Sequence, residues 1–169
     1  MRFLILSAFA LSACAATPVQ VQPAPAADVT TTIFVVRHAE KASDGDDPPL
    51  TEQGLARAEA LAVLMVDEPL VAVYSTPFQR TQQTVAAAAT GHGLGVTDYD
   101  PRSDLPVLIL DQHAGAVVLV AGHSNTVPSI VAGLGAPEQP EIPHEHYGDL
   151  YRVTRVGDDV ELVIERYGD

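Results

Sequence analysis

The sequence IFVVRHAEK at residues 33–41 decides the fold of this chain, because four apolar residues run directly into Arg37 and His38. An apolar run of this kind, rich in β-branched and aromatic residues, predicts a buried strand. In an open α/β sheet, ligands bind beyond the carboxyl ends of the strands. The stretch therefore predicts a strand that delivers a guanidinium and an imidazole to a ligand site.

Two further apolar runs end in the same kinds of side chain. The run at residues 117–122 precedes His123, and the run at residues 71–74 precedes a short turn and then Arg80. We expect these two residues to join Arg37 and His38 at one edge of the sheet. Guanidiniums present planar forks of donors that match phosphate oxygens. The four side chains together predict a site for a phosphoryl group.

Composition limits the class of protein and the class of partner. The chain has 169 residues, of which 47% are hydrophobic, which is enough for one globular domain with a core. Its formal net charge is −13, which argues against nucleic acid as a partner. The same charge would repel polyanions at long range, so we expect a small phosphorylated substrate. The oligomeric state stays open.

The first residues predict export. Residues 1–14 start with a positive charge, continue as an apolar stretch too short to span a bilayer, and end in the sequence LSAC. This ending resembles the bacterial lipoprotein cleavage motif, in which the Cys becomes the first mature residue and carries acyl chains. We therefore expect Cys14 to be lipidated and to anchor an exported cell-envelope protein to a membrane. The alternative is an ordinary signal peptide, or a reduced, buried Cys14.

The rest of the chain divides into a tether and one domain. Residues 15–29 are rich in Ala and Pro with almost no charge, and we interpret them as a tether. Residues 30–169 alternate strand-like and helix-like patterns, which predicts an α/β three-layer sandwich around a mainly parallel central sheet. Two runs near the end, 149–153 and 160–167, predict a hairpin that adds antiparallel edge strands.

Two helix starts are predicted from capping residues. Thr51 precedes apolar residues at helical spacing, beginning with Leu55, and is predicted to cap that helix. Ser75 or Thr76 is predicted to cap the next helix, with Pro77 at its first position.

The four converging side chains suggest a reaction. A neutral imidazole is a competent nucleophile toward phosphorus, so His38 could form a phosphohistidine that water hydrolyses. Arg37 and Arg80 would stabilise the charge on the equatorial oxygens in the transition state. His123 precedes a helix start, which favours an anion, and would donate to the same oxygens when protonated. Since these cations neutralise the phosphate, no metal or other cofactor is expected.

The ordered set of motifs resembles the histidine phosphatase superfamily, which has the phosphoglycerate-mutase-like fold. The matching motifs are Arg37-His38, Arg80 after the sequence STP, and the sequence GHSN that contains His123. The resemblance implies that His38 is the phosphorylated nucleophile and that Arg37, Arg80 and His123 form the phosphate pocket. Most members have Gly after the first His, whereas this chain has Ala39 in the motif Arg-His-Ala-Glu-Lys. The change is small enough for the loop to tolerate.

The general acid is the second departure from the family pattern. Larger members carry a Glu or Asp on an insertion after the third strand, and here that region is only residues 97–104. Asp100 is the predicted acid, with Asp104 and Glu40 as alternatives. A carboxyl group in this role needs a raised pKa. Without an acid the enzyme would be restricted to good leaving groups.

The sequence therefore predicts a metal-independent phosphatase acting on phosphomonoesters or on a phosphoprotein. A phosphomutase is one alternative, although the short insertion region disfavours it because a mutase must close over its intermediate. A lipoprotein that binds a phosphorylated ligand without turnover is the other. The sequence HEH at residues 144–146 is predicted to be a loop rather than a metal site, and a position at the border of the pocket mouth stays open.

Overall fold

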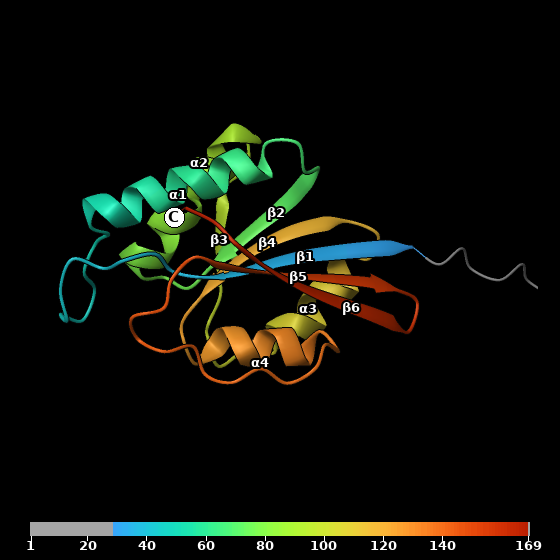
Figure 1. Ribbon diagram of the computed structural model, residues 1–169. Helices are drawn as coiled ribbons and strands as arrows, with labels where there is room; N and C mark the ends of the chain where they lie inside the picture. Colours follow the sequence, from blue (N-terminus) through green and yellow to red (C-terminus); the bar gives the residue numbers. More distant parts are fainter. Residues whose placement is uncertain (1–28, 169) are drawn as a thin grey trace, which may run out of the picture.

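The structure is a computed structural model that describes residues 29–168. The predictions for the signal segment, for Cys14 and for most of the tether therefore lie outside the described residues. The elements alternate between strand and helix for most of the chain (Figure 1). In chain order they are β1 (Thr30–Arg37), α1 (Glu52–Met65), β2 (Leu70–Ser75), α2 (Gln79–Gly91), β3 (Val96–Asp98), α3 (Leu105–Gln112), β4 (Val117–Gly122), α4 (Thr126–Gly133), β5 (Asp149–Val156) and β6 (Asp159–Arg166).

The strands form one sheet in the order β3-β2-β4-β1-β5-β6. The first four of these strands are mutually parallel, whereas β5 pairs antiparallel with β1 and β6 antiparallel with β5. Helices α1 and α2 cover one face, and α3 and α4 cover the other (Figure 1). This arrangement confirms the predicted three-layer α/β sandwich with a hairpin at one edge. None of the helices within residues 29–168 is long and apolar enough to cross a bilayer.

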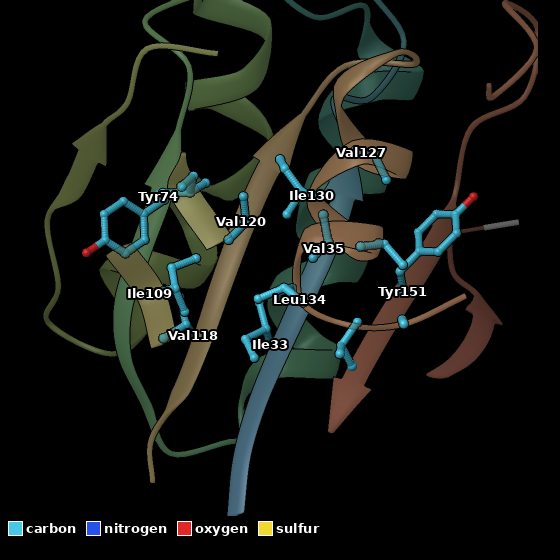
Figure 2. Packing of buried hydrophobic residues seen from close by; sticks show 14 of the residues in the cluster. Ile33, Val35, Tyr74, Ile109, Val118, Val120, Val127, Ile130, Leu134 and Tyr151 are labelled. Atoms are coloured by element: carbon cyan, nitrogen blue, oxygen red, sulfur yellow. The ribbon is translucent and has the colours of Figure 1, made fainter. Parts of the chain in front are cut away.

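Strand β1 separates two apolar cores because its side chains alternate between the faces of the sheet. Ile33 and Val35 pack with the inner faces of α3 and α4, as Figure 2 shows. Phe34 and Val36 pack with α1 and α2 on the opposite face. All four are buried. A continuous apolar run is thus what a strand covered on both faces requires.

The two predicted helix starts have different outcomes. Thr51 caps α1, and its side chain accepts a hydrogen bond from the Gly54 N–H. Leu55, however, is 49% exposed, because α1 faces the sheet through other positions. The second prediction is wrong, since α2 begins at Gln79 with no side-chain cap. The hydroxyl of Thr76 is used elsewhere, as described below.

A buried ion pair ties the loop after β1 to α1. The Arg57 guanidinium lies against the Glu40 carboxylate, with 2.8 Å between Nη2 and Oε1. It also donates to the Tyr167 carbonyl near the end of the chain. Gly54 lets α1 approach this loop closely, because a Cβ at that position would collide with the Glu40 carbonyl oxygen. These contacts hold the segment that follows His38 in place.

Replacing Arg57 should therefore destabilise the domain strongly. We expect Arg57→Met to lower the free energy of unfolding by about 3 kcal/mol or more, because it leaves a buried carboxylate unpaired. Urea unfolding followed by circular dichroism measures the change. The matched control is Arg102→Met, which breaks an exposed pair with Asp100 and should cost no more than about 0.5 kcal/mol. Equal losses in both variants would contradict this interpretation.

Candidate active site

The ends of two parallel strands place the two predicted histidines side by side. Arg37 at the end of β1 is in register with Gly122 at the end of β4. The His38 N–H donates to the Gly122 carbonyl at 2.9 Å, which continues the ladder by one bond. The centroids of the His38 and His123 rings lie 5.5 Å apart. Both rings line a cavity of about 370 Å³, together with Arg37 and Arg80. The structure thus brings together the four side chains that the sequence placed in one site.

The His38 ring is oriented by the backbone of the next residue. Its Nδ1 lies 2.8 Å from the Ala39 carbonyl oxygen, so Nδ1 carries the proton and Nε2 carries the lone pair. Burial is the main cause that lowers the pKa of His38 to about 3, and the charge of Arg37 adds to it. The imidazole is therefore neutral at neutral pH, and Nε2 is the nitrogen available to an electrophile.

The methyl group of Ala39 packs in an apolar environment. Ala39 is fully buried and packs with Leu50 and Ala58 in a small apolar cluster. Its N–H donates to the Thr84 hydroxyl at 2.9 Å. The loop after His38 therefore accommodates the Ala that departs from the Gly of the motif it resembles.

Thr76 orients the second histidine. Its hydroxyl lies 2.9 Å from His123 Nε2, which explains why it does not cap α2. The His123 N–H donates to the Thr126 hydroxyl at the start of α4. Burial, followed by the charges of Arg80 and Arg37, lowers the pKa of His123 to about 4. No pattern in the sequence distinguished Thr76 from an ordinary helix cap.

Each arginine is held in place by contacts that its guanidinium makes with neighbouring groups. Arg37 Nη1 donates to the carbonyls of Pro143 and His146 at 2.8 and 2.9 Å, and its Cζ lies 4.2 Å from the centre of the Tyr147 ring. The Arg80 Cζ lies 4.4 Å from the centre of the Phe78 ring. These aromatic residues were not predicted, because only tertiary contact places them over the guanidiniums.

Both arginines keep a donor without a partner. Within the described residues, the Nε atoms of Arg37 and Arg80 are buried and make no hydrogen bond. A buried unpaired donor is costly, and more so on a charged group. Both residues also line the cavity, where a bound anion would meet their guanidiniums. The pattern fits a site that holds a phosphate.

The carboxyl groups predicted as general acids do not line this cavity. Asp100 is exposed and forms an ion pair with Arg102, with 3.1 Å between Oδ2 and Nη2. Hydrogen bonds from Arg102 lower the pKa of Asp100, the opposite of what a general acid needs. Asp104 is exposed at the start of α3, and Glu40 is held by Arg57. The structure therefore does not support any of the three in this role.

The segment at residues 144–146 borders the cavity through one of its residues. His144 is among the residues that line it. His146 instead pairs with Asp149, with 2.8 Å between Nε2 and Oδ2. Across residues 29–168, no group of three or more His, Cys, Asp or Glu side chains is arranged to hold a metal ion.

A family model matches the segment that carries three of the four site residues. Residues 33–105 match the histidine phosphatase superfamily, branch 1. The matched segment includes Arg37, His38 and Arg80, whereas His123 lies beyond it. No curated protein matches the chain.

Solved structures of histidine phosphatases and related proteins share the fold. Bacillus stearothermophilus YhfR superposes with a TM-score of 0.64 and 19% identity, covering 82% of this chain and 97% of that chain. A Nakamurella multipartitia protein assigned as the phosphohistidine phosphatase SixA gives 0.62 and 24%, covering 84% and 99%. Phosphoglycerate mutase from Bacillus anthracis gives 0.60 and 14%, covering 84% and 94%. The fold is therefore phosphoglycerate-mutase-like.

The buried histidines make stability depend on pH. Their folded-state pKa values, about 3 and about 4, lie below the ordinary value of 6.5. Between pH 6.5 and these values the unfolded chain binds more protons than the folded chain. Above pH 6.5 these histidines are neutral in both states, so their burial does not lower the free energy of unfolding. As the pH falls below 6.5, the free energy of unfolding decreases, because protonation favours the unfolded chain.

We therefore expect the thermal midpoint of the wild type to fall more steeply between pH 6.5 and 4 than that of His38→Gln. The variant lacks one of the two histidines that must be buried uncharged. Thermal unfolding followed by circular dichroism at a series of pH values measures both slopes. Parallel slopes would show that His38 is protonated as readily in the folded chain as in the unfolded chain.

Proposed function

We propose that this protein is a metal-independent phosphatase that hydrolyses phosphomonoesters through a phosphohistidine on His38. One observation carries the proposal. A neutral His38 with its Nε2 free lies in the same cavity as His123 and two guanidiniums that have unpaired donors. A nucleophile beside fixed cations is what transfer of a phosphoryl group requires.

The first step is attack by His38 on phosphorus. The Nε2 lone pair forms the N–P bond, and the bond from phosphorus to the leaving oxygen breaks on the opposite side. Arg37 and Arg80 donate to the equatorial oxygens, whose charge is greatest in the transition state. The nucleophile needs no deprotonation, because burial already keeps His38 neutral.

His123 supports the same step from the adjacent strand end. Its Nε2 is held by Thr76, so the ring has one preferred orientation before substrate arrives. A phosphate dianion in the cavity would favour the protonated form of His123 over the neutral form found in the free protein. Protonated His123 then donates to a phosphoryl oxygen, and in the second step water attacks phosphorus and releases His38.

Neighbouring structures suggest the kinds of substrate to test. Proteins with this fold include ones assigned as phosphohistidine phosphatases and a phosphoglycerate mutase. We infer a phosphorylated side chain or a small phosphomonoester as substrate, consistent with the strongly negative net charge. A ligand-binding protein without turnover is the second candidate. The observation that favours it is that no carboxyl group within residues 29–168 lines the cavity as a proton donor.

Activity of the purified full-length protein tests the proposal. We expect hydrolysis of p-nitrophenyl phosphate that resists EDTA and is blocked by vanadate, which mimics the transition state. His38→Ala should lower kcat by about 10⁴-fold or more, because removing a nucleophile abolishes the covalent path. The matched control is His113→Gln, because His113 ends α3 and bonds to Tyr74 outside the cavity.

The phosphoenzyme gives a second measurement. A wild-type protein quenched during turnover should carry acid-labile phosphate that is absent from His38→Ala. Binding of phosphorylated compounds without product would support the second candidate. Full activity of His38→Ala would exclude His38 as the nucleophile.

The proposal also places the protein at a membrane. Residues 30–169 would form the catalytic domain, and an acyl group on Cys14 would anchor it through residues 15–29. The sequence LSAC, which ends at Cys14, supports this. We expect cells fed radiolabelled palmitate to label the wild type and not Cys14→Ala. Labelling of the variant would exclude Cys14 as the acylated residue.

A further inference from the structure

The proposed reaction lacks a proton donor for the leaving group. When the bond from phosphorus to an alkyl oxygen breaks, the oxygen leaves as a strongly basic alkoxide unless a general acid protonates it. Within residues 29–168, no carboxyl side chain lines the catalytic cavity. Any donor supplied by the described chain is therefore a different kind of group. This inference rests on the proposed function.

Few side chains that line the cavity can release a proton. Arginine does not deprotonate in proteins, which excludes Arg37 and Arg80. The lining residues that do titrate are His38, Lys41, His123 and His144. His38 is the nucleophile, and its attack requires a neutral ring.

Two more of these residues are poorly suited to the role. The Lys41 ammonium donates to the Asp44 carboxylate at 2.6 Å, so it is already engaged by another side chain. His123 lies beside Arg80 and Arg37 and is directed by Thr76, so its proton would serve a phosphoryl oxygen. His144 remains.

The position of His144 suits an acid. His38 and His144 both line the cavity, and because His38 is only 5% exposed whereas His144 is exposed, we take His38 as its floor and His144 as its mouth. In an in-line displacement the leaving oxygen departs on the side opposite the nucleophile. A nucleophile on the floor therefore directs the leaving oxygen toward the mouth.

The loop that carries His144 is held from both sides of that residue. Arg37 Nη1 donates to the carbonyls of Pro143 and His146, which flank it closely in sequence. Tyr147 stacks on the same guanidinium. The arginine beside the nucleophile thus also places the loop at the mouth.

We propose that His144 is the general acid that protonates the leaving oxygen. As His38 Nε2 forms its bond to phosphorus, the bond to the leaving oxygen breaks, and that oxygen takes a proton from the His144 imidazolium. The alcohol departs and His144 is left neutral. In the second step His144 accepts a proton from the attacking water, the N–P bond breaks, and inorganic phosphate leaves.

Leaving-group dependence tests this role. The full-length wild type and His144→Gln are compared on p-nitrophenyl phosphate, whose phenolate leaves without protonation, and on glycerol phosphate, whose alkoxide does not. We expect the variant to lose about 100-fold in kcat/KM on glycerol phosphate and less than about threefold on p-nitrophenyl phosphate. The matched control is His146→Gln, because that side chain lies in the same loop and pairs with Asp149 outside the cavity. It should show no selective loss.

The other outcomes separate this inference from the proposed function. Equal losses of His144→Gln on both substrates, or no loss on either, would overturn the role of His144 and leave the phosphatase intact. A selective loss in Lys41→Gln, instead of in His144→Gln, would transfer the role to Lys41. A wild type that hydrolyses neither substrate, or an active His38→Ala, would overturn the proposed function and the role of His144 with it.

Discussion

Parallel pairing of β1 with β4 is the constraint on which the site depends. The pairing aligns Arg37 with Gly122, so the residues that follow, His38 and His123, emerge next to each other. A slip of one residue would turn the side chains of β1 to the opposite faces and exchange its two apolar cores. The packing of Ile33 and Val35 against one helical layer, and of Phe34 and Val36 against the other, therefore also sets the distance between the two imidazoles.

Distant segments of the chain meet at Arg37 and Arg80 and hold them in place. Arg37 contacts the loop before β5 through two backbone carbonyls and the Tyr147 ring, so the guanidinium beside His38 also positions the loop that borders the cavity. The Phe78 ring packs against the Arg80 guanidinium. Aromatic faces hold guanidiniums without using all of their donors, which leaves N–H groups for a ligand.

Burial gives the site its protonation state. The chain is strongly acidic, yet the cavity is lined by Arg37, Arg80 and the neutral His38 and His123, and no carboxylate within residues 29–168 lines it. Desolvation lowers the pKa of both histidines, and the neighbouring guanidiniums lower it further. The free protein thus has a neutral His38 and fixed positive charge in the same cavity. In the proposed reaction, the bound phosphate would supply negative charge inside the cavity.

The sequence by itself determined the strands, the mainly parallel character of the sheet, the terminal hairpin and the four side chains at the strand ends, whereas the order of the strands in the sheet came from the tertiary structure. These features follow from local apolar patterns and from the rule that parallel strands end at one edge. Only the tertiary structure decided which groups the polar side chains contact. It paired Asp100 with Arg102 and Glu40 with Arg57, placed Thr76 on His123, and brought His144 to the cavity. The reason is physical: a strand is specified by its own residues, whereas the environment of a polar side chain is set by groups that folding brings from elsewhere in the chain.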